Sequence, residues 1–108
     1  MIFDTLDSSE QAFFAQSLSA QLAQLGLDSQ TVASFFDARQ LPCPMPLLKA
    51  KITLRGVAGG QALYLVATDK NSQTDLMAYC QKNGLTAHTW RTDGDGGAIY
   101  HFIIIKPL

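Results

Sequence analysis

In this 108-residue chain, residues 8–25 carry apolar side chains every three or four positions, which is the spacing of one helix face. These positions are Phe14, Leu18, Leu22 and Leu25. Ser8 and Gln11 have the spacing of a capping box, and Gly26 supplies a C-terminal stop. The pattern predicts an N-terminal helix that buries its apolar stripe against the rest of the chain or against a second copy.

Beyond this helix, short stretches rich in β-branched, aromatic and other apolar residues predict four strands. They are residues 31–37, 62–68, 85–92 and 98–106. The second stretch is almost continuously apolar, as expected for a central strand that is covered on both faces. The glycine-rich residues 93–97 separate the last two strands, and their composition predicts a hairpin turn.

Two further helices are predicted between these strands. The first covers residues 44–55 and ends before Gly56. Its side chains available for burial are Leu47, Leu48, Ile52 and Leu54. The second runs to residue 82, with Asp69, Asn71 or Ser72 as its N-cap. Its expected inward stripe consists of Leu76, Met77, Tyr79 and Cys80.

The resulting order after the N-terminal helix is βαβαββ. A strand, a crossover helix and a second strand predict a parallel pair, and the last two strands predict an antiparallel hairpin. We therefore expect an α/β (α+β) two-layer sandwich, with two helices on one face of a four-stranded mixed sheet. Residues 31–108 form this domain, and residues 1–30 form an acidic helical extension.

Charge and cysteine content narrow the class of protein. The net charge is −1, and the first 30 residues carry Asp4, Asp7, Glu10 and Asp28 but no Lys or Arg. Two cysteines do not make a disulfide framework, so a reducing, cytoplasmic setting is expected. The start lacks the basic region of a secretory signal, and no apolar run approaches a membrane span.

The residue that most indicates chemistry is Cys43, which lies between Pro42 and Pro44. Proline disfavours helical geometry in the residue before it and fits the first turn of a helix, so Cys43 is predicted to be the N-cap. The positive end of the helix dipole would then favour its thiolate. A lone cysteine is more often a packing residue, but packing does not require flanking prolines.

The absence of several known motifs limits the kind of thiol chemistry that the chain can perform. There is no Cys-x-x-Cys, which disfavours a dithiol oxidoreductase, and no spacing typical of a metal site, so we expect neither metal nor cofactor. His88 and His101 both fall in predicted strands. A Cys-His pair stays open, although a strand histidine is more often structural. The remaining interpretation is a thiolate that carries a group.

Residues 37–51, which read DARQLPCPMPLLKAK, resemble the signature of the TusA/SirA sulfur-carrier family, with its Cys-Pro-x-Pro hallmark at Cys43, Pro44 and Pro46. The resemblance extends over about residues 31–107 and implies the same βαβαββ sandwich. It also implies that Cys43 accepts a persulfide from a cysteine desulfurase and passes the sulfur to an acceptor protein, as in tRNA thiolation. Gln40 stands where the family usually has glycine, and the N-terminal helix lies outside the family core.

Three basic residues follow the motif on the predicted helix, namely Lys49, Lys51 and Arg55. They are candidates for stabilising a thiolate or docking an acidic partner surface, whereas the plainer interpretation is a solvated helix face. An alternative from another class is a non-catalytic regulatory module that binds protein or RNA. No membrane partner is expected, and no aromatic-plus-basic signature supports direct nucleic-acid binding.

Overall fold

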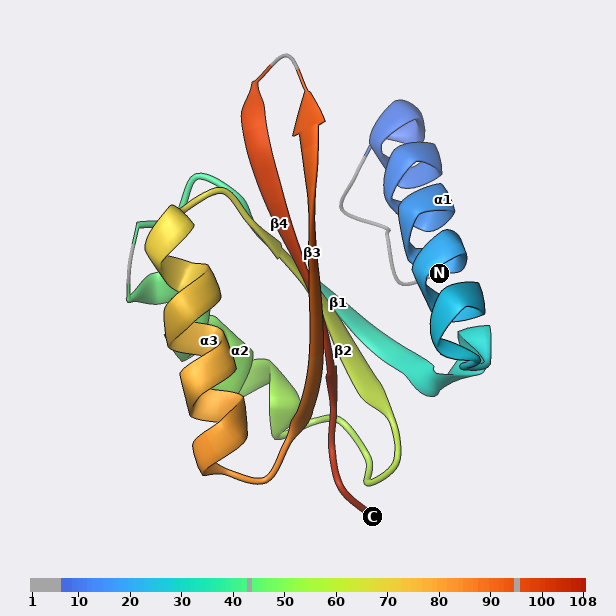
Figure 1. Ribbon diagram of the computed structural model, residues 1–108, viewed down its shortest axis with the longest axis vertical. Helices are drawn as coiled ribbons and strands as arrows, with labels where there is room; N and C mark the ends of the chain where they lie inside the picture. Colours follow the sequence, from blue (N-terminus) through green and yellow to red (C-terminus); the bar gives the residue numbers. More distant parts are fainter. Residues whose placement is uncertain (1–6, 43, 95) are drawn as a thin grey trace. The chain divides into compact units, whose positions relative to one another are not determined.

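The structure is a computed structural model that describes residues 7–42, 44–94 and 96–108 (Figure 1). The elements in chain order are α1 (Ser8–Leu25), the 3-10 helix η1 (Ser29–Thr31), β1 (Val32–Ala38), α2 (Met45–Leu54), β2 (Ala62–Ala67), α3 (Lys70–Lys82), β3 (Thr86–Gly94) and β4 (Gly97–Ile105). They fall into two compact units, Met1–Thr31 and Val32–Leu108. None of the described helices has the length and hydropathy that a bilayer-spanning segment needs.

The first unit contains α1, whose ends agree with the helix predicted for residues 8–25. The predicted capping box is wrong, because Asp7 is the N-cap and its carboxylate accepts a hydrogen bond from the Glu10 amide at 2.8 Å. A charged carboxylate at this position also interacts favourably with the positive end of the helix dipole. Gly26 ends the helix in the left-handed conformation, at φ 73°, as predicted.

The second unit is built on a four-stranded mixed sheet with the strand order β1-β2-β4-β3. β1 and β2 are parallel, while β4 is antiparallel to both β2 and β3. β2 is a central strand, and all six of its residues are buried, as its apolar sequence predicted. The hairpin between β3 and β4 closes where Gly94 pairs with Gly97. The expected sheet is therefore confirmed.

Helices α2 and α3 lie side by side on one face of this sheet, which confirms the two-layer βαβαββ arrangement (Figure 1). Alternate residues of the central strands point toward the helices, since successive side chains of a strand face opposite sides. The core between the layers includes Ala50 and Leu54 of α2, Leu76 and Cys80 of α3, Leu63 and Leu65 of β2, and Phe102 and Ile104 of β4. This packing holds α2 against the sheet.

The expected buried face of α2 is correct only in part. Leu54 is buried and Leu47 packs against the core, but Leu48 and Ile52 are 43% and 56% exposed. The inward row is instead Pro46, Ala50 and Leu54. These residues are four apart and so share one face, and the small Ala50 lets the helix approach the sheet closely.

Candidate functional site

The candidate site is the loop that joins β1 to α2. It begins at the carboxyl end of β1. Because Ala38 and Ala67 are paired in the sheet, this end lies beside the carboxyl end of the parallel strand β2. Loops at this edge of a parallel pair are common positions for functional residues. Cys43 belongs to this loop but lies outside the described residues.

The first support of the loop is an ion pair between Asp37 and Arg39. The guanidinium donates from Nε and Nη2 to the two carboxylate oxygens, each at 2.8 Å, and the Arg39 amide donates to Oδ1 at 3.1 Å. Both side chains are partly buried, at 27% and 21% exposure. A two-pronged pair of this kind has defined geometry, so it fixes the direction in which the chain leaves β1.

A second support connects the loop to β2. The Gln40 amide donates a hydrogen bond of 3.0 Å to Oγ1 of Thr68, the residue that follows β2. Gln40 has φ 71°, in the left-handed region that favours glycine. Glycine adopts this conformation without strain, so the glycine that the sequence resemblance led us to expect here would fit the turn. The glutamine has not removed the turn, but it places a side chain on a strained backbone.

Replacing Gln40 by glycine should therefore stabilise the protein. We expect Gln40→Gly to raise the free energy of unfolding by about 0.5–1 kcal/mol, because relief of the left-handed strain exceeds the extra chain entropy of glycine. Urea denaturation measures this difference. Gln40→Ala is the matched control, since alanine removes the side chain but keeps the strain. A gain in Gln40→Ala as large as that in Gln40→Gly would show that strain is not the cause.

The loop enters α2 through a proline-defined turn. Pro44 is the N-cap of α2, so the prediction that Cys43 is the N-cap is wrong by one residue. The Met45 amide donates to the Pro42 carbonyl at 2.8 Å, which fixes the approach of Pro42 to the first turn. Pro46 is buried at the second helical position, where the missing N–H breaks no helical bond. Among the described residues, no side chain donates or accepts a hydrogen bond that caps the N-terminus of α2.

Two of the three basic residues predicted on this helix line a common pocket. Lys51 and Arg55 line a pocket at the C-terminal end of the helix, whereas Lys49 does not. Lys51 Nζ lies 5.0 Å from the ring centroid of Tyr79, in the geometry of a cation–π contact. Lys106, which the sequence did not single out, lines the same pocket, so the basic group spans two elements that are distant in the sequence.

Cys80 is a core residue, as its place on the inward stripe of α3 indicated. Its side chain is 1% exposed, and burial raises the pKa of its thiol to about 11. Both properties oppose formation of a thiolate, which is the reactive form. Cys80 is thus unsuited to serve as an accessible nucleophile in the folded protein.

The two histidines lie in strands, as predicted, and His101 has a structural role. Its Nδ1 lies 2.7 Å from the Tyr64 hydroxyl and its Nε2 lies 2.8 Å from Thr92 Oγ1. A neutral imidazole has one donor and one acceptor, so one hydroxyl donates to the ring and the other accepts. The imidazole ring also stacks on the Trp90 ring, with 4.8 Å between the ring centroids. Burial lowers the pKa of His101 to about 4, which keeps it neutral near pH 7.

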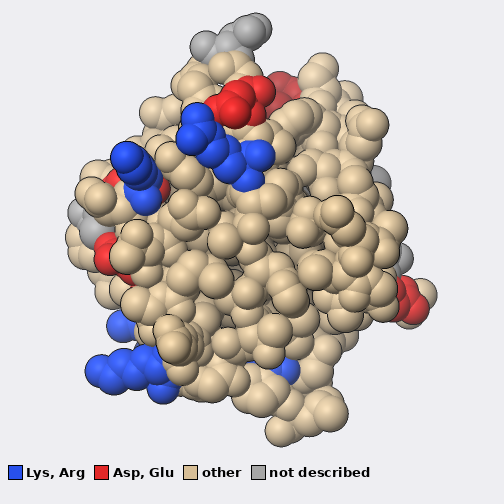
Figure 2. All heavy atoms as spheres, viewed as in Figure 1, with Lys and Arg blue, Asp and Glu red and all other residues tan. Residues whose placement is uncertain are grey.

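Within the described ranges, no three or more His, Cys, Asp or Glu side chains are placed to hold a metal ion. On the face shown in Figure 2, basic and acidic side chains lie next to one another near the top. Nucleic-acid-binding proteins typically show a continuous basic stripe. This face has no such stripe.

Comparisons with known proteins identify the family and the fold. The family model described as Sulfurtransferase TusA matches residues 35–106. Sulfur carrier protein TusA of Allochromatium vinosum is 37% identical over 70 residues, which cover 65% of this chain and 88% of that protein. YrkI of Bacillus subtilis is also 37% identical over 70 residues, which cover 65% of this chain and 89% of that protein. The crystal structure of the SirA-like protein from Desulfitobacterium hafniense matches this structure with a TM-score of 0.55 and 20% sequence identity. The match covers 69% of this chain and 97% of that chain, and it concerns the fold alone.

Proposed function

Because the chain belongs to the TusA family of sulfur carriers, we propose that Cys43 accepts a persulfide sulfur from a donor such as a cysteine desulfurase and relays it to an acceptor protein. The observation that carries this proposal is the sequence Cys43-Pro44-Met45-Pro46, which lies inside the matched region and runs into the first turn of α2. Relay of a persulfide between cysteines belongs in a reducing compartment, and we accordingly propose the cytoplasm. Thiolation of tRNA is one pathway that such a relay would serve.

The proposed step is a thiol–persulfide exchange. The Cys43 thiolate attacks the outer sulfur of the donor's persulfide, so that a new S–S bond forms at Cys43 while the donor's S–S bond breaks. The donor cysteine leaves as a thiolate, and Cys43 now holds the persulfide. Attack by an acceptor thiolate on the outer sulfur repeats the exchange and restores Cys43. No external oxidant or reductant is consumed, because one S–S bond replaces another.

The described residues support this chemistry by shaping the loop. Asp37 and Arg39 set the exit from β1, and the bond from Gln40 to Thr68 holds the loop against the end of β2. Pro44 and Pro46 define the start of α2, whose N-terminal dipole favours an anion nearby. The protein's share in the reaction is therefore to present one nucleophile in a fixed loop.

Mass spectrometry tests the assignment of Cys43. Incubation with a cysteine desulfurase and free cysteine should add the mass of one sulfur atom to the unmutated chain and to Cys80→Ser, but not to Cys43→Ser. Reducing the products should remove the added mass, since a persulfide is reducible. Equal loading of Cys43→Ser would contradict the proposal. Partner binding that persists in Cys43→Ala without any loading would favour the non-catalytic module instead.

We further propose that Lys49, Lys51 and Arg55 help to dock an acidic surface of the sulfur donor. Charges at the edge of an interface mainly change the rate of association and its salt dependence. Lys51→Glu combined with Arg55→Glu should slow desulfurase-dependent loading about tenfold at low salt, and much of the difference should vanish at high salt. Loading rates at two ionic strengths measure this effect.

The matched control for docking is Lys70→Glu combined with Lys82→Glu. Both lysines are exposed on α3 outside the pocket, and the double change alters the net charge by the same amount. This control should load at nearly the unmutated rate. If both double variants slow loading equally, net charge and not a specific docking surface accounts for the effect.

A further inference from the structure

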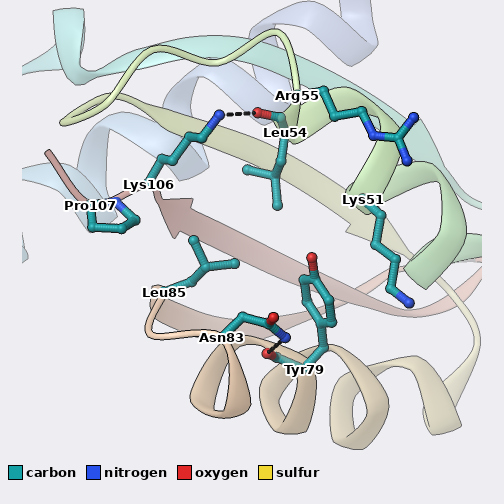
Figure 3. Close-up of a pocket in the computed structure, with 8 residues that line it drawn as sticks. All are labelled: Lys51, Leu54, Arg55, Tyr79, Asn83, Leu85, Lys106 and Pro107. Atoms are coloured by element: carbon teal, nitrogen blue, oxygen red, sulfur yellow. Dashed lines mark hydrogen bonds between the residues drawn. The ribbon is translucent and has the colours of Figure 1, made fainter.

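A surface pocket of about 400 Å³ lies at the end of the helical layer farthest from the motif (Figure 3). Leu54 and Arg55 contribute from the end of α2, and Asn83 contributes from the end of α3. α2 has ten residues, which span about 15 Å at the usual rise of an α-helix. The pocket is therefore separate from the loop that precedes the N-terminus of α2.

The floor of this pocket is apolar. Leu54 and Leu85 point toward its middle from two sides, Pro107 closes a third side, and the ring of Tyr79 forms a wall (Figure 3). Leucine, proline and aromatic surfaces of this kind favour an apolar or aromatic group, because its burial removes apolar area from water. The Tyr79 hydroxyl is directed toward Leu54 and supplies a polar group close to the floor.

The rim of the pocket is basic. Lys51, Arg55 and Lys106 all line it, and none of the described lining residues is acidic. The charged ends of Lys51 and Arg55 extend along one side, as Figure 3 shows. Both side chains are long, so their charged groups can reach an anion held at that side. Three cations without a lining carboxylate favour a negatively charged ligand.

The helix ends beside the pocket do not cancel this charge. The last turns of α2 and α3 together carry a partial negative charge of about one unit, against three full positive charges. Lys106 Nζ also donates to the Leu54 carbonyl at 3.0 Å, and Asn83 Nδ2 donates to the Tyr79 carbonyl at 2.8 Å. These two donors cover carbonyls that would otherwise face an anion. The net charge at the rim of the pocket is therefore positive.

The geometry points to a binding site for a small aromatic anion, with its ring on the floor formed by Leu54, Leu85 and Pro107 and its phosphate or carboxylate at Lys51 and Arg55. The volume lies within the range of small-molecule sites, roughly 300–1,000 Å³. A ligand held here occupies the opposite end of α2 from the motif, and it would share Lys51 and Arg55 with the proposed docking surface for the sulfur donor.

Titration with phenyl phosphate, followed by amide NMR of the full chain, tests the site. The expected result is saturable shifts of the Asn83, Leu85 and Lys106 amides. Inorganic phosphate, which lacks the ring, and benzyl alcohol, which lacks the charge, should each bind about tenfold more weakly. Lys51→Gln combined with Arg55→Gln should weaken phenyl phosphate binding about tenfold, as expected for the loss of two exposed ionic contacts. Lys70→Gln combined with Lys82→Gln is the control and should bind normally.

Two outcomes would overturn this site. One is a set of shifts spread over surface lysines and arginines without saturation, which indicates unspecific ion binding. The other is absence of pocket shifts; if Lys51→Gln/Arg55→Gln then also slows desulfurase loading, these residues serve only a protein partner. Loading of Cys43 is measured separately, so a negative titration leaves the sulfur-carrier proposal untouched, and a negative loading experiment leaves this site untouched.

Discussion

We expect iodoacetamide to alkylate Cys43 about 100 times faster than Cys80 in the folded protein at pH 7. Burial raises the pKa of the Cys80 thiol from 9.0 to about 11, and this rise alone reduces its thiolate fraction at pH 7 about 100-fold relative to an unburied thiol. The low exposure of Cys80 slows its reaction further. A Cys43 thiolate favoured by the start of α2 would widen the gap. Peptide mapping after timed alkylation gives both rates.

Two variants and one condition separate this explanation from others. Cys43→Ala should remove the fast reaction, while Cys80→Ala should retain it. Unfolding the chain in guanidinium should bring the two rates together, because burial of Cys80 is then lost. Equal rates in the folded protein would contradict the assignment of Cys43 as the accessible nucleophile and would remove the argument for its activation.

The second large effect is a loss of stability in acid that depends on His101. Burial lowers the pKa of His101 to about 4, whereas an unfolded histidine titrates near 6.5. Between these values the unfolded chain binds a proton that the folded chain does not, so stability falls as the pH falls. From pH 7.5 to pH 4 this residue should remove about 3 kcal/mol from the free energy of unfolding.

Comparison with variants isolates this contribution from carboxylates that titrate in the same range. His101→Phe should be less stable at pH 7.5, because the Tyr64 and Thr92 hydroxyls lose the ring nitrogens they contact. Its stability should nevertheless decline less steeply toward pH 4 than that of the unmutated chain. His88→Gln removes the other histidine and should keep the steep decline. Identical slopes in His101→Phe and the unmutated chain would show that His101 does not titrate on unfolding.

The fold was largely predictable because its elements have distinct patterns. The unbroken apolar run of β2 indicated a central strand, and the helical spacing of Phe14, Leu18 and Leu22 predicted α1 with its observed ends. The buried face of α2 was less predictable. This helix carries apolar residues on several sides, so periodicity could not decide between the row containing Leu48 and the row containing Ala50.

The candidate site was predictable only where its residues are close in the sequence. Cys43, Pro44 and Pro46 form a local motif and could be found directly. The contact from Gln40 to Thr68 joins residues at the ends of two strands, and its geometry depends on the parallel pairing of β1 and β2. The pocket depends on Lys106, which follows β4 and donates a hydrogen bond to Leu54 at the end of α2. Such contacts follow from tertiary packing.

The central claim is that one cysteine in the loop before α2 carries the sulfur. The most direct measurement is to load the protein with a cysteine desulfurase, trap the persulfide by alkylation, digest the chain and locate the extra sulfur by tandem mass spectrometry. The account predicts the sulfur on the peptide that contains Cys43, in the unmutated chain and in Cys80→Ser alike. Extra sulfur found on Cys80 while Cys43 stays unmodified would contradict it.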